Sequence, residues 1–424
     1  MQKMLAWIDA RFPLTALWES QWGKYIAPKN FNFWYYFGSL AAFVLVIQIV
    51  TGIFLTMNYK PDAQKAFESV EYIMRDVEWG WLIRYMHSTG ASMFFIVVYL
   101  HMYRGMIYGS YRKPRELTWL LGCLIYLALM AEAFFGYLLP WGQMSYWGAQ
   151  VIVNLFSAIP LVGEDLALWI RGDYTISDIT LNRFFAFHVV AVPLVLLGLV
   201  MAHLMALHET GSNNPDGVQI KEQPKDPATG LPLDGIYSHP YYTVKDIVGV
   251  VVFLAVFSAI VFFAPEMGGY FLEYNNFVPA DPLKTPVHIA PVWYFTPYYA
   301  MLRAVPSYFG TPVWGVIVMV LAVVIFFVLP WLDRGAVRSI RYRGTLYKVW
   351  VAIFVISFLV LGYLGVVPVT IWGQFGPNVP IVGGVDVATF VARVFTALYF
   401  AFFVLMPWYT AIDRTKPEPT RVMP

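Results

Sequence analysis

The sequence predicts an all-α membrane protein with eight transmembrane helices. Three observations lead to this fold class. The 424-residue chain is 59% apolar and only 13% charged, whereas soluble domains carry about 25% charged residues. Its mean hydropathy is +0.60. It also contains separate apolar segments of about 20 residues, the length that a helix needs to cross the hydrocarbon core of a bilayer.

The same composition excludes several classes of protein. Disorder requires few aromatic residues and much charge, yet 18% of this chain is aromatic. A net charge of +2 gives no case for nucleic-acid binding. The single cysteine, Cys123, excludes a disulfide framework, a cysteine-based zinc site, iron–sulfur ligation and haem attached through a C-x-x-C-H motif.

The apolar runs set the expected order of segments along the chain. The eight predicted spans are 34–57, 82–108, 117–138, 182–207, 246–264, 312–331, 347–367 and 387–408. Before them, residues 1–30 mix tryptophans with basic residues, which predicts an amphipathic helix at the membrane interface and no signal peptide.

The spans divide the rest of the chain into two groups of four helices. We expect a four-helix bundle over residues 31–210 with a loop at 139–181, then a connecting loop at 211–245. A C-terminal four-helix region follows at 246–408 with a loop at 265–311, and residues 409–424 form a tail. Long loops without charge runs are usually functional.

The basic residues predict the orientation. With eight spans both termini lie on one side, and that side holds 19 of the 28 lysines and arginines. Basic residues concentrate in cytoplasmic loops. Both termini and the 211–245 loop are therefore predicted to be cytoplasmic, on the electrically negative side, and the 139–181 and 265–311 loops lie opposite.

Four of the seven histidines lie within spans: His87 and His101 in the second, His188 and His203 in the fourth. A separation of 14 residues returns a helix to within about 40° of the same face and rises about 21 Å. The second pair is 15 apart, and Pro193 between them can re-phase the helix.

The second and fourth spans run in the same direction, so His87 can face His188 and His101 can face His203. Two facing imidazoles can fill both axial positions of an iron porphyrin. The first four spans are therefore predicted to form a di-haem four-helix bundle. A lone membrane histidine more often bonds between helices; the matching intervals favour ligation.

Four glycines repeat the 14-residue interval: Gly38 and Gly52 in the first span, Gly122 and Gly136 in the third. Glycine pairs alone usually indicate close helix packing. Here we expect them to leave room for the edges of two flat macrocycles.

Three arginines lie near the histidines: Arg84, Arg104 and Arg183. Buried arginines require partners, and haem propionates are suitable ones. For Arg104, snorkelling toward lipid headgroups is the competing interpretation.

Several long motifs resemble the cytochrome b subunit of the ubiquinol–cytochrome c reductase (cytochrome bc) complex, respiratory complex III. They are Arg84-Tyr85-Met86-His87, the run from Tyr137 to Ser145, Phe184-Phe185-Ala186-Phe187-His188, the run from His208 to Pro215, and His239-Pro240-Tyr241-Tyr242. The resemblance covers nearly the whole chain. All eight spans in one chain fit the respiratory type, since the photosynthetic relative divides this region between two polypeptides.

The resemblance implies a Q cycle. Ubiquinol is oxidised at the positive face, and ubiquinone is reduced at the negative face after electrons cross between two b-type haems. It implies that His87 and His188 hold the low-potential haem, and His101 and His203 the high-potential one. The implied partners are a Rieske iron–sulfur protein and a membrane-anchored c-type cytochrome, in a homodimeric complex. The His188–His203 interval is one residue longer than in the mitochondrial members and resembles the photosynthetic branch. Some bacterial chains share it, which favours a bacterial inner membrane.

The resemblance places quinol oxidation between residues 139–160 and 265–300. The pocket residues it implies are Gly148, Pro291, Val292, Trp293 and Tyr294. The family has a glutamate at position 292, and valine cannot take a proton. We therefore expect proton handling by Tyr294, Tyr299 or Glu266. An aromatic belt is the plainer interpretation of Trp293 and Tyr294.

At the negative face, the residues that match the family's quinone-reducing site are His208, Ser212, Lys245 and Asp246. A histidine at a helix C-terminus can instead be stabilised by the helix dipole. We assign no ligand role to His239 or His288.

Two other functions compete with this interpretation. A di-haem quinone-reducing anchor for a dehydrogenase or hydrogenase would explain the four histidines but not the long Pro- and Gly-rich loops. A secondary transporter with a histidine proton relay would bind no iron and would have helices interrupted at mid-membrane.

Overall fold

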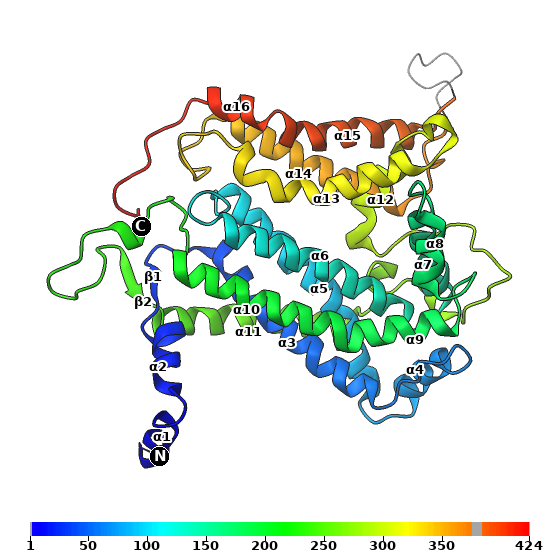
Figure 1. Cartoon of the computed structure of the whole chain (residues 1–424), viewed down its shortest axis with the longest axis horizontal. Coiled ribbons are helices and arrows are strands. Elements are labelled where there is room, and N and C mark those ends of the chain that lie inside the picture. Colours follow the sequence, from blue (N-terminus) through cyan, green and yellow to red (C-terminus); the bar gives the residue numbers. More distant parts are fainter. Residues whose placement is uncertain (1, 375–383, 424) are drawn as a thin grey trace.

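The computed structural model describes residues 2–374 and 384–423 (Figure 1). Within these residues, eight helices are long and apolar enough to cross a membrane, which confirms the predicted fold class. They are α3 (Tyr36–Thr56), α5 (Gly80–Ile107), α6 (Glu116–Leu138), the continuous helix formed by α9 (Asp178–Ala186), η3 (Phe187–Ala191) and α10 (Val192–Thr210), then α11 (Tyr241–Phe263), α13 (Val313–Leu332), α14 (Thr345–Val366) and α15 (Val387–Val404).

The shorter elements lie between and beside the spans. The helices are α1 (Gln2–Asp9), α2 (Leu14–Trp18), α4 (Ala66–Arg75), α7 (Gln143–Ser157), α8 (Gly163–Arg171), α12 (Thr296–Ala304) and α16 (Met406–Ile412); single turns are η1 (Glu19–Gly23), η2 (Phe33–Tyr35), η4 (Ile220–Glu222), η5 (Met267–Gly269), η6 (Tyr274–Phe277), η7 (Trp293–Phe295) and η8 (Tyr308–Gly310). Strands β1 (Ile26–Pro28) and β2 (Gly235–Tyr237) pair antiparallel, with Ile26 opposite Tyr237.

Both chain termini lie at the left end of the bundle in Figure 1, and α4, α7 and α8 lie at the right. We call these the terminal end and the far end. The N-terminal segment forms two short helices and not one, because the chain turns between Asp9 and Leu14, where Pro13 lacks an N–H. The structure does not test its predicted place at a membrane interface.

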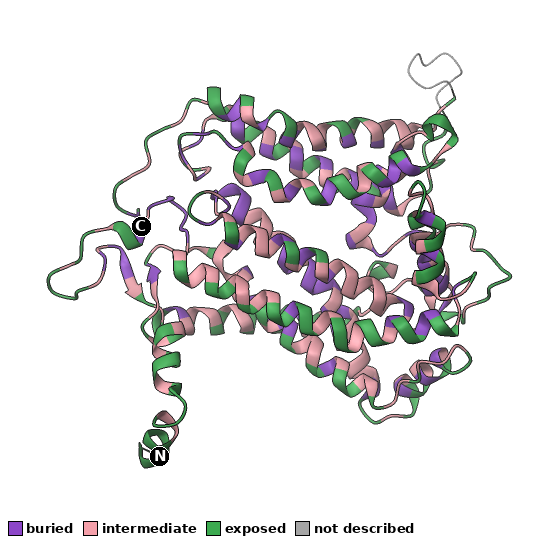
Figure 2. Ribbon diagram, in the orientation of Figure 1, coloured by how far each residue is buried: buried purple, intermediate pink, exposed green. Residues whose placement is uncertain are grey.

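The first four spans pack as two pairs, α3 against α5 and α6 against α10. Much of α10 is exposed (Figure 2), and many of its exposed residues are large and apolar. Such a surface is stable only in contact with another apolar phase, in agreement with a multi-pass membrane protein. Residues 375–383 of the predicted 246–408 region lie outside the described residues.

The fourth span contains a π-helical turn, η3, and this turn explains the longer histidine interval. Its five residues include His188 and end two residues before Pro193. Pro193 lacks the N–H that a regular helix needs, and a π turn inserts one extra residue into an α-helix. The 15-residue interval to His203 therefore behaves like the 14-residue interval on α5.

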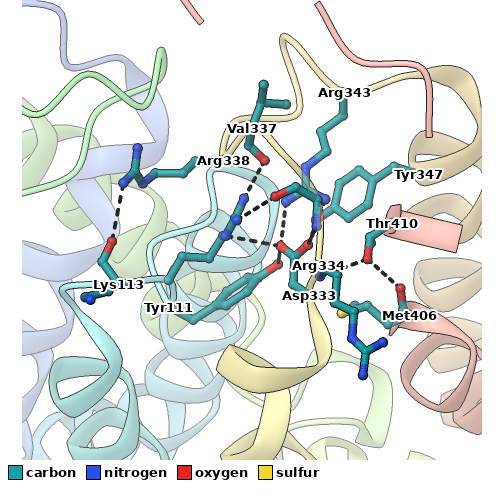
Figure 3. A network of polar contacts seen from close by, with 12 residues as sticks. Tyr111, Lys113, Asp333, Arg334, Val337, Arg338, Arg343, Tyr347, Met406 and Thr410 are labelled. Carbon is teal, nitrogen blue, oxygen red and sulfur yellow. Dashed lines mark hydrogen bonds and ion pairs between the residues drawn. The ribbon is translucent and has the colours of Figure 1, made fainter. Parts of the chain in front are cut away.

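A buried polar network holds the two halves of the chain together at the terminal end (Figure 3). Asp333, after α13, accepts hydrogen bonds from Tyr111 at 2.7 Å and from Arg343 at 3.0 Å and 2.5 Å. Burial alone would raise the pKa of Asp333, but Arg343 and the other donors hold it below its ordinary value. The α5–α6 loop is thereby fixed to the α13–α14 loop.

Candidate functional site

The four histidines of the spans meet as two pairs inside the first four helices. The rings of His87 and His188 have centroids 6.1 Å apart and planes at 87°, near the far end. The rings of His101 and His203 have centroids 6.4 Å apart and planes at 60°, near the terminal end. The structure thus brings together the pairs that the spacing predicts.

These separations fit a metal ion held between two imidazoles. A metal–nitrogen bond is about 2 Å long, and the ring centre lies ~1.1 Å beyond the nitrogen, so two opposed rings would be roughly 6 Å apart. Among the described residues, no group of three or more His, Cys, Asp or Glu side chains is placed to hold a metal. The remaining ligands would come from a cofactor, as in a haem.

Each of the four glycines lies against one of these imidazoles. A Cβ added at Gly38 would be 3.2 Å from His101, at Gly52 3.3 Å from His87, and at Gly122 3.4 Å from His203; at Gly136 it would clash directly with His188. The immediate reason for glycine here is therefore the histidine ring on the neighbouring helix. The expected contact with a macrocycle edge is not needed to explain the spacing.

The outer nitrogens of the far-end pair both meet hydrogen-bond acceptors. His188 Nδ1 lies 2.9 Å from the backbone carbonyl of Glu132, so this nitrogen must carry the proton. His87 Nδ1 lies 2.9 Å from Thr51 Oγ1, whose own proton goes to the carbonyl of Ile47 at 2.7 Å. In both rings Nε2 is then the unprotonated nitrogen that a metal requires.

The terminal-end pair has a cation as its neighbour. Arg104 Nη2 lies 3.1 Å from His101 Nδ1, and the same guanidinium donates to Ser110 at 3.3 Å. It also lies 5.0 Å from the centre of the Tyr35 ring. Arg104 therefore stays inside the protein and does not extend toward headgroups.

A cavity of about 480 Å³ joins the far-end histidines to the predicted quinol segment. His87, His188 and Arg84 line one part of it, and Val292 and Tyr294 line another. Arg84 makes no side-chain hydrogen bond or ion pair within residues 2–374 and 384–423, so its charge is available to an anionic ligand. Arg183 is not brought to the cavity: it is exposed and donates to the carbonyl of Trp169.

The other residues predicted for the quinol pocket do not line this cavity. Gly148 on α7 faces the ring of Tyr137, and a Cβ there would be 3.7 Å from it. The indole of Trp293 donates to Ser92 at 3.1 Å. Pro291 and Glu266 are not among the residues that line the cavity.

Tyr299, a predicted proton acceptor, also lies outside the lining, and its hydroxyl donates to the carbonyl of Ile289 at 3.1 Å. Of the three candidates for that role, only Tyr294 faces the cavity.

The structure adds a carboxyl group that the sequence argument missed. Glu273 accepts a hydrogen bond from the hydroxyl of Tyr137, which lines the cavity. Burial raises the pKa of Glu273 to about 7, and the Tyr137 hydrogen bond opposes this shift.

Docking of the 265–311 loop places Glu273. Asn276 exchanges two hydrogen bonds with Ser145, at 2.8 Å and 2.9 Å, and the backbone of Gln143 donates to Val278 at 2.9 Å. No spacing in the sequence relates Glu273 to Tyr137, so only the docked loop reveals the contact.

At the terminal end, two of the predicted quinone-site residues share one neighbour. The ring of Tyr25 lies 4.4 Å from that of His208, and its hydroxyl is 3.0 Å from Ser212 Oγ. His208 Nδ1 also contacts Gln21 at 2.6 Å. The sequence argument missed both Tyr25 and Gln21, which belong to the segment assigned to the membrane interface.

The other two predicted residues lie at the start of α11. Asp246 accepts a hydrogen bond at 3.1 Å from Ser39, the residue after Gly38. Lys245 lies over the rings of Tyr241 and Tyr242, at 4.8 Å and 5.4 Å. The structure contains no direct contact between this pair and His208 or Ser212 in the part of the chain that it describes.

Comparison with known proteins agrees with this arrangement. Residues 23–211 match the family "Cytochrome b/b6/petB", and residues 279–377 match "Cytochrome b(C-terminal)/b6/petD". The chain is 62% identical to a cytochrome b of Allochromatium vinosum, over 99% of this chain and 98% of that protein. It is 47% identical to a cytochrome b of Rhodospirillum rubrum, over 99% of this chain and 96% of the relative.

A solved structure described as "Hyperthermophilic respiratory Complex III" has the same fold. One of its chains superposes with a TM-score of 0.83 at 38% sequence identity, covering 96% of this chain and 98% of that chain.

Proposed function

The chain belongs to the cytochrome b family, and from this premise we propose that it holds two b-type haems. It is the cytochrome b of a respiratory complex III, a ubiquinol–cytochrome c reductase, and the core catalytic subunit of that oxidoreductase. The proposed axial ligands are His87 with His188 and His101 with His203. The paired imidazoles, each packed on a glycine, are the observation that carries this assignment.

The two haems are proposed to differ in potential, and when bound they supply reversible one-electron chemistry across the bundle. At the far end His87 donates to the Thr51 hydroxyl, and His188 Nδ1 lies 2.9 Å from the backbone carbonyl and 3.1 Å from the carboxyl group of Glu132; such acceptors increase ligand basicity and favour the low-potential role. At the terminal end the charge of Arg104 favours an added electron and the high-potential role. Arg84 and Arg104 are the proposed propionate partners, and Arg183 is dropped from that set.

Quinol oxidation is proposed for the far-end cavity, beside Val292 and Tyr294. Oxidation of one quinol releases two electrons and two protons, so a base must lie close to the quinol hydroxyl. We assign that role to Glu273. Its carboxylate takes one proton from the quinol, either directly or by way of the Tyr137 hydroxyl to which it is hydrogen-bonded. Glu273 replaces the missing glutamate at position 292 because its carboxyl group is hydrogen-bonded to Tyr137, which lines the cavity, whereas in the described part of the chain neither Glu266 nor Tyr299 has a side-chain hydrogen bond to a lining residue.

The electrons are proposed to divide at this cavity. One passes to a Rieske iron–sulfur protein and then to a membrane-anchored c-type cytochrome, and the other crosses the bundle to a quinone at the terminal end. There His208, Ser212, Lys245 and Asp246 are the proposed quinone site, with Tyr25 between the first two. The net result is a Q cycle that moves protons across the membrane.

The setting follows from the same premise. The chain is a multi-pass membrane protein and its relative in the solved structure is part of a respiratory complex. We assign it to a bacterial inner membrane with both termini cytoplasmic, in a homodimeric complex. Residues 31–210 would be the haem-binding unit, and 246–408 with the 265–311 loop would complete the quinol site. The transporter and the dehydrogenase anchor have no support from the comparisons.

One experiment tests the central assignment. The purified complex, given decylubiquinol, should reduce a soluble cytochrome c, and its reduced-minus-oxidised spectrum should show two b-type haems per chain. One haem per chain would contradict this assignment. Unchanged quinol turnover in a His188→Leu variant, which lacks one member of the His87–His188 pair, would also contradict it. The spectrum alone separates this function from a transporter.

A further inference from the structure

Three tyrosine hydroxyls from three different helices meet in the interior of the protein. Tyr99 Oη on α5 lies 3.2 Å from Tyr126 Oη on α6, which lies 2.9 Å from Tyr298 Oη on α12. Tyr99 also contacts the backbone carbonyl of Tyr294 at 2.5 Å. The side chains of Tyr126 and Tyr298 are buried, so water is not available to replace these bonds.

The number of hydroxyl protons fixes the direction in which this chain of three hydrogen bonds donates. A neutral phenol has one proton to donate, and a carbonyl oxygen can only accept. The proton of Tyr99 therefore goes to the carbonyl of Tyr294, and Tyr99 must accept from Tyr126. Tyr126 has then used its own proton, so it must accept from Tyr298. Only this one direction satisfies all three contacts.

Both ends of this hydrogen-bond chain belong to one short segment of the sequence, residues 292–298. Tyr294 lies in η7 and Tyr298 in the first turns of α12. The same segment is held on α5 by ring stacking of Tyr294 on Phe95, with centroids 3.9 Å apart and planes at 6°, and by the Trp293–Ser92 hydrogen bond. These contacts attach the 292–298 segment to the helices that carry His87, His101 and Gly136.

We infer that Tyr99, Tyr126 and Tyr298 are positioning residues for quinol binding, acting as a one-way hydrogen-bond chain that holds the 292–298 segment against the haem-bearing helices. The inference rests on the function proposed above, because Val292 and Tyr294 line the cavity assigned to quinol. The three phenols themselves do not line that cavity, so they act through the segment and not on the substrate.

The direction predicts a graded response to removal of each hydroxyl. Tyr99→Phe removes the donor to the Tyr294 carbonyl and leaves the proton of Tyr126 without an acceptor. Tyr126→Phe leaves only the proton of Tyr298 unpaired. Tyr298→Phe leaves no donor unpaired. An unsatisfied buried donor is costly, whereas an unused lone pair on an oxygen costs little.

The test is to measure KM and kcat for decylubiquinol in the intact complex for each of the three variants. We expect KM to rise about tenfold in Tyr99→Phe, about fivefold in Tyr126→Phe and by less than twofold in Tyr298→Phe. Turnover at saturating quinol should change much less, because the catalytic groups are untouched. The haem spectrum should be the same in all three.

The matched control is Tyr399→Phe. Tyr399 is also fully buried and also donates to a backbone carbonyl, that of Ala322 at 2.7 Å, but it is not bonded to the chain of phenols. A similar rise of KM in Tyr399→Phe, or a larger effect in Tyr298→Phe than in Tyr99→Phe, would overturn the inference.

A second measurement separates this inference from the proposed function. Hydrogen exchange of the backbone amides of residues 293–304 should accelerate most in Tyr99→Phe, less in Tyr126→Phe and least in Tyr298→Phe. That order does not depend on quinol oxidation. If the parent complex fails to oxidise quinol, the proposed function fails; if exchange is unchanged in Tyr99→Phe, the hydrogen-bond chain does not hold the segment.

Discussion

The two histidine pairs are built alike but have different surroundings. Each imidazole packs on a glycine of the neighbouring helix, at both ends of the bundle. At the far end both outer nitrogens meet hydrogen-bond acceptors, among them the carboxyl group of Glu132 at 3.1 Å from His188, and a largely apolar cavity opens beside the rings. At the terminal end His101 meets the guanidinium of Arg104.

If the two pairs hold haems as proposed, this difference would give electron transfer through the bundle a direction. The ligands are the same, so a gradient has to come from the groups around them. On the proposed function, the guanidinium of Arg104 in contact with His101 would stabilise an added electron there, whereas at the far end Arg84 lines the cavity with His87 but, in the described part of the chain, makes no hydrogen bond to a ring nitrogen. Electrons released at the far-end cavity would therefore move toward the terminal end.

The sharpest test of two separate sites removes one ligand. His101→Leu should abolish binding of the terminal-end haem and leave the far-end haem in place, because the two pairs share no side chain. Haem content should fall from two to one per chain, measured by the reduced-minus-oxidised spectrum. Loss of both haems at normal protein level would contradict the pairing; His188→Leu supplies the opposite case.

The next test concerns proton transfer at the far end. Glu273→Gln should slow quinol oxidation by about a hundredfold, the usual contribution of a positioned base. The pKa of Glu273 is raised to about 7, so in the parent the rate should rise with pH through about 7 as the carboxylate forms. That rise should disappear in the variant.

Two matched variants complete this comparison. Glu266→Gln, in the same loop but without the hydrogen bond to the cavity-lining Tyr137 that Glu273 has, should leave the pH profile unchanged. Val292→Glu places a carboxyl group in the cavity. As a single variant it should alter the pH dependence of quinol oxidation. Combined with Glu273→Gln it should restore part of the lost rate. An unchanged profile in Glu273→Gln would remove this residue from the proton path.

The glycines offer a graded test of the two ends. Gly136→Ala would place its Cβ against three ring atoms of His188, whereas Gly122→Ala would approach His203 no closer than 3.4 Å. Overpacking costs about 1–3 kcal/mol, so we expect roughly tenfold weaker retention of the far-end haem in Gly136→Ala. Gly122→Ala should have a smaller effect on the terminal-end haem.

Gly198→Ala is the control for the glycine series, because no atom lies within 4 Å of a Cβ at that position on α10. Haem retention during a thermal ramp is the measurement. Equal losses in all three variants would mean that the glycines serve general helix packing.

The smallest expected effect concerns the electrostatic difference itself. Arg104→Gln should lower the midpoint potential of the terminal-end haem by roughly 60 mV, a tenfold change for a one-electron couple, and leave the far-end potential unchanged. Redox titration of the two spectral components measures both. A shift of the far-end potential alone would reverse our assignment of the two environments.

Much of the fold and of the candidate site was predictable from the sequence because hydrophobic length and helical repeat are local properties. Eight apolar runs predict eight spans, and a 14-residue interval predicts which histidines share a face. The glycine interval was also recognised, although its reason, contact with the imidazoles, required the packing of α3 on α5 and of α6 on α10.

The residues that sequence reasoning missed depend on contacts between distant segments. Glu273 meets Tyr137 across 136 positions, and Tyr25 meets Ser212 across 187. No periodicity links such residues, since the loops that carry them are placed by hydrogen bonds such as Asn276 to Ser145. The sequence offers Glu266 in the same loop as one of three candidates, and only the docked loop shows that Glu273 is the carboxyl group bonded to Tyr137.

The amino-acid sequence alone predicts that the chain crosses a membrane, how many times it does so, and which imidazoles lie at equal depth, because these properties follow from solvation and from the geometry of a single helix. Only the packing of distant segments shows which carboxyl group is bonded to the cavity-lining Tyr137, which nitrogen of His87 and of His188 is left for a metal, and in which direction the three tyrosine hydroxyls donate. These depend on where two separately folded segments meet, and a hydrogen bond between them has no signature in either segment alone.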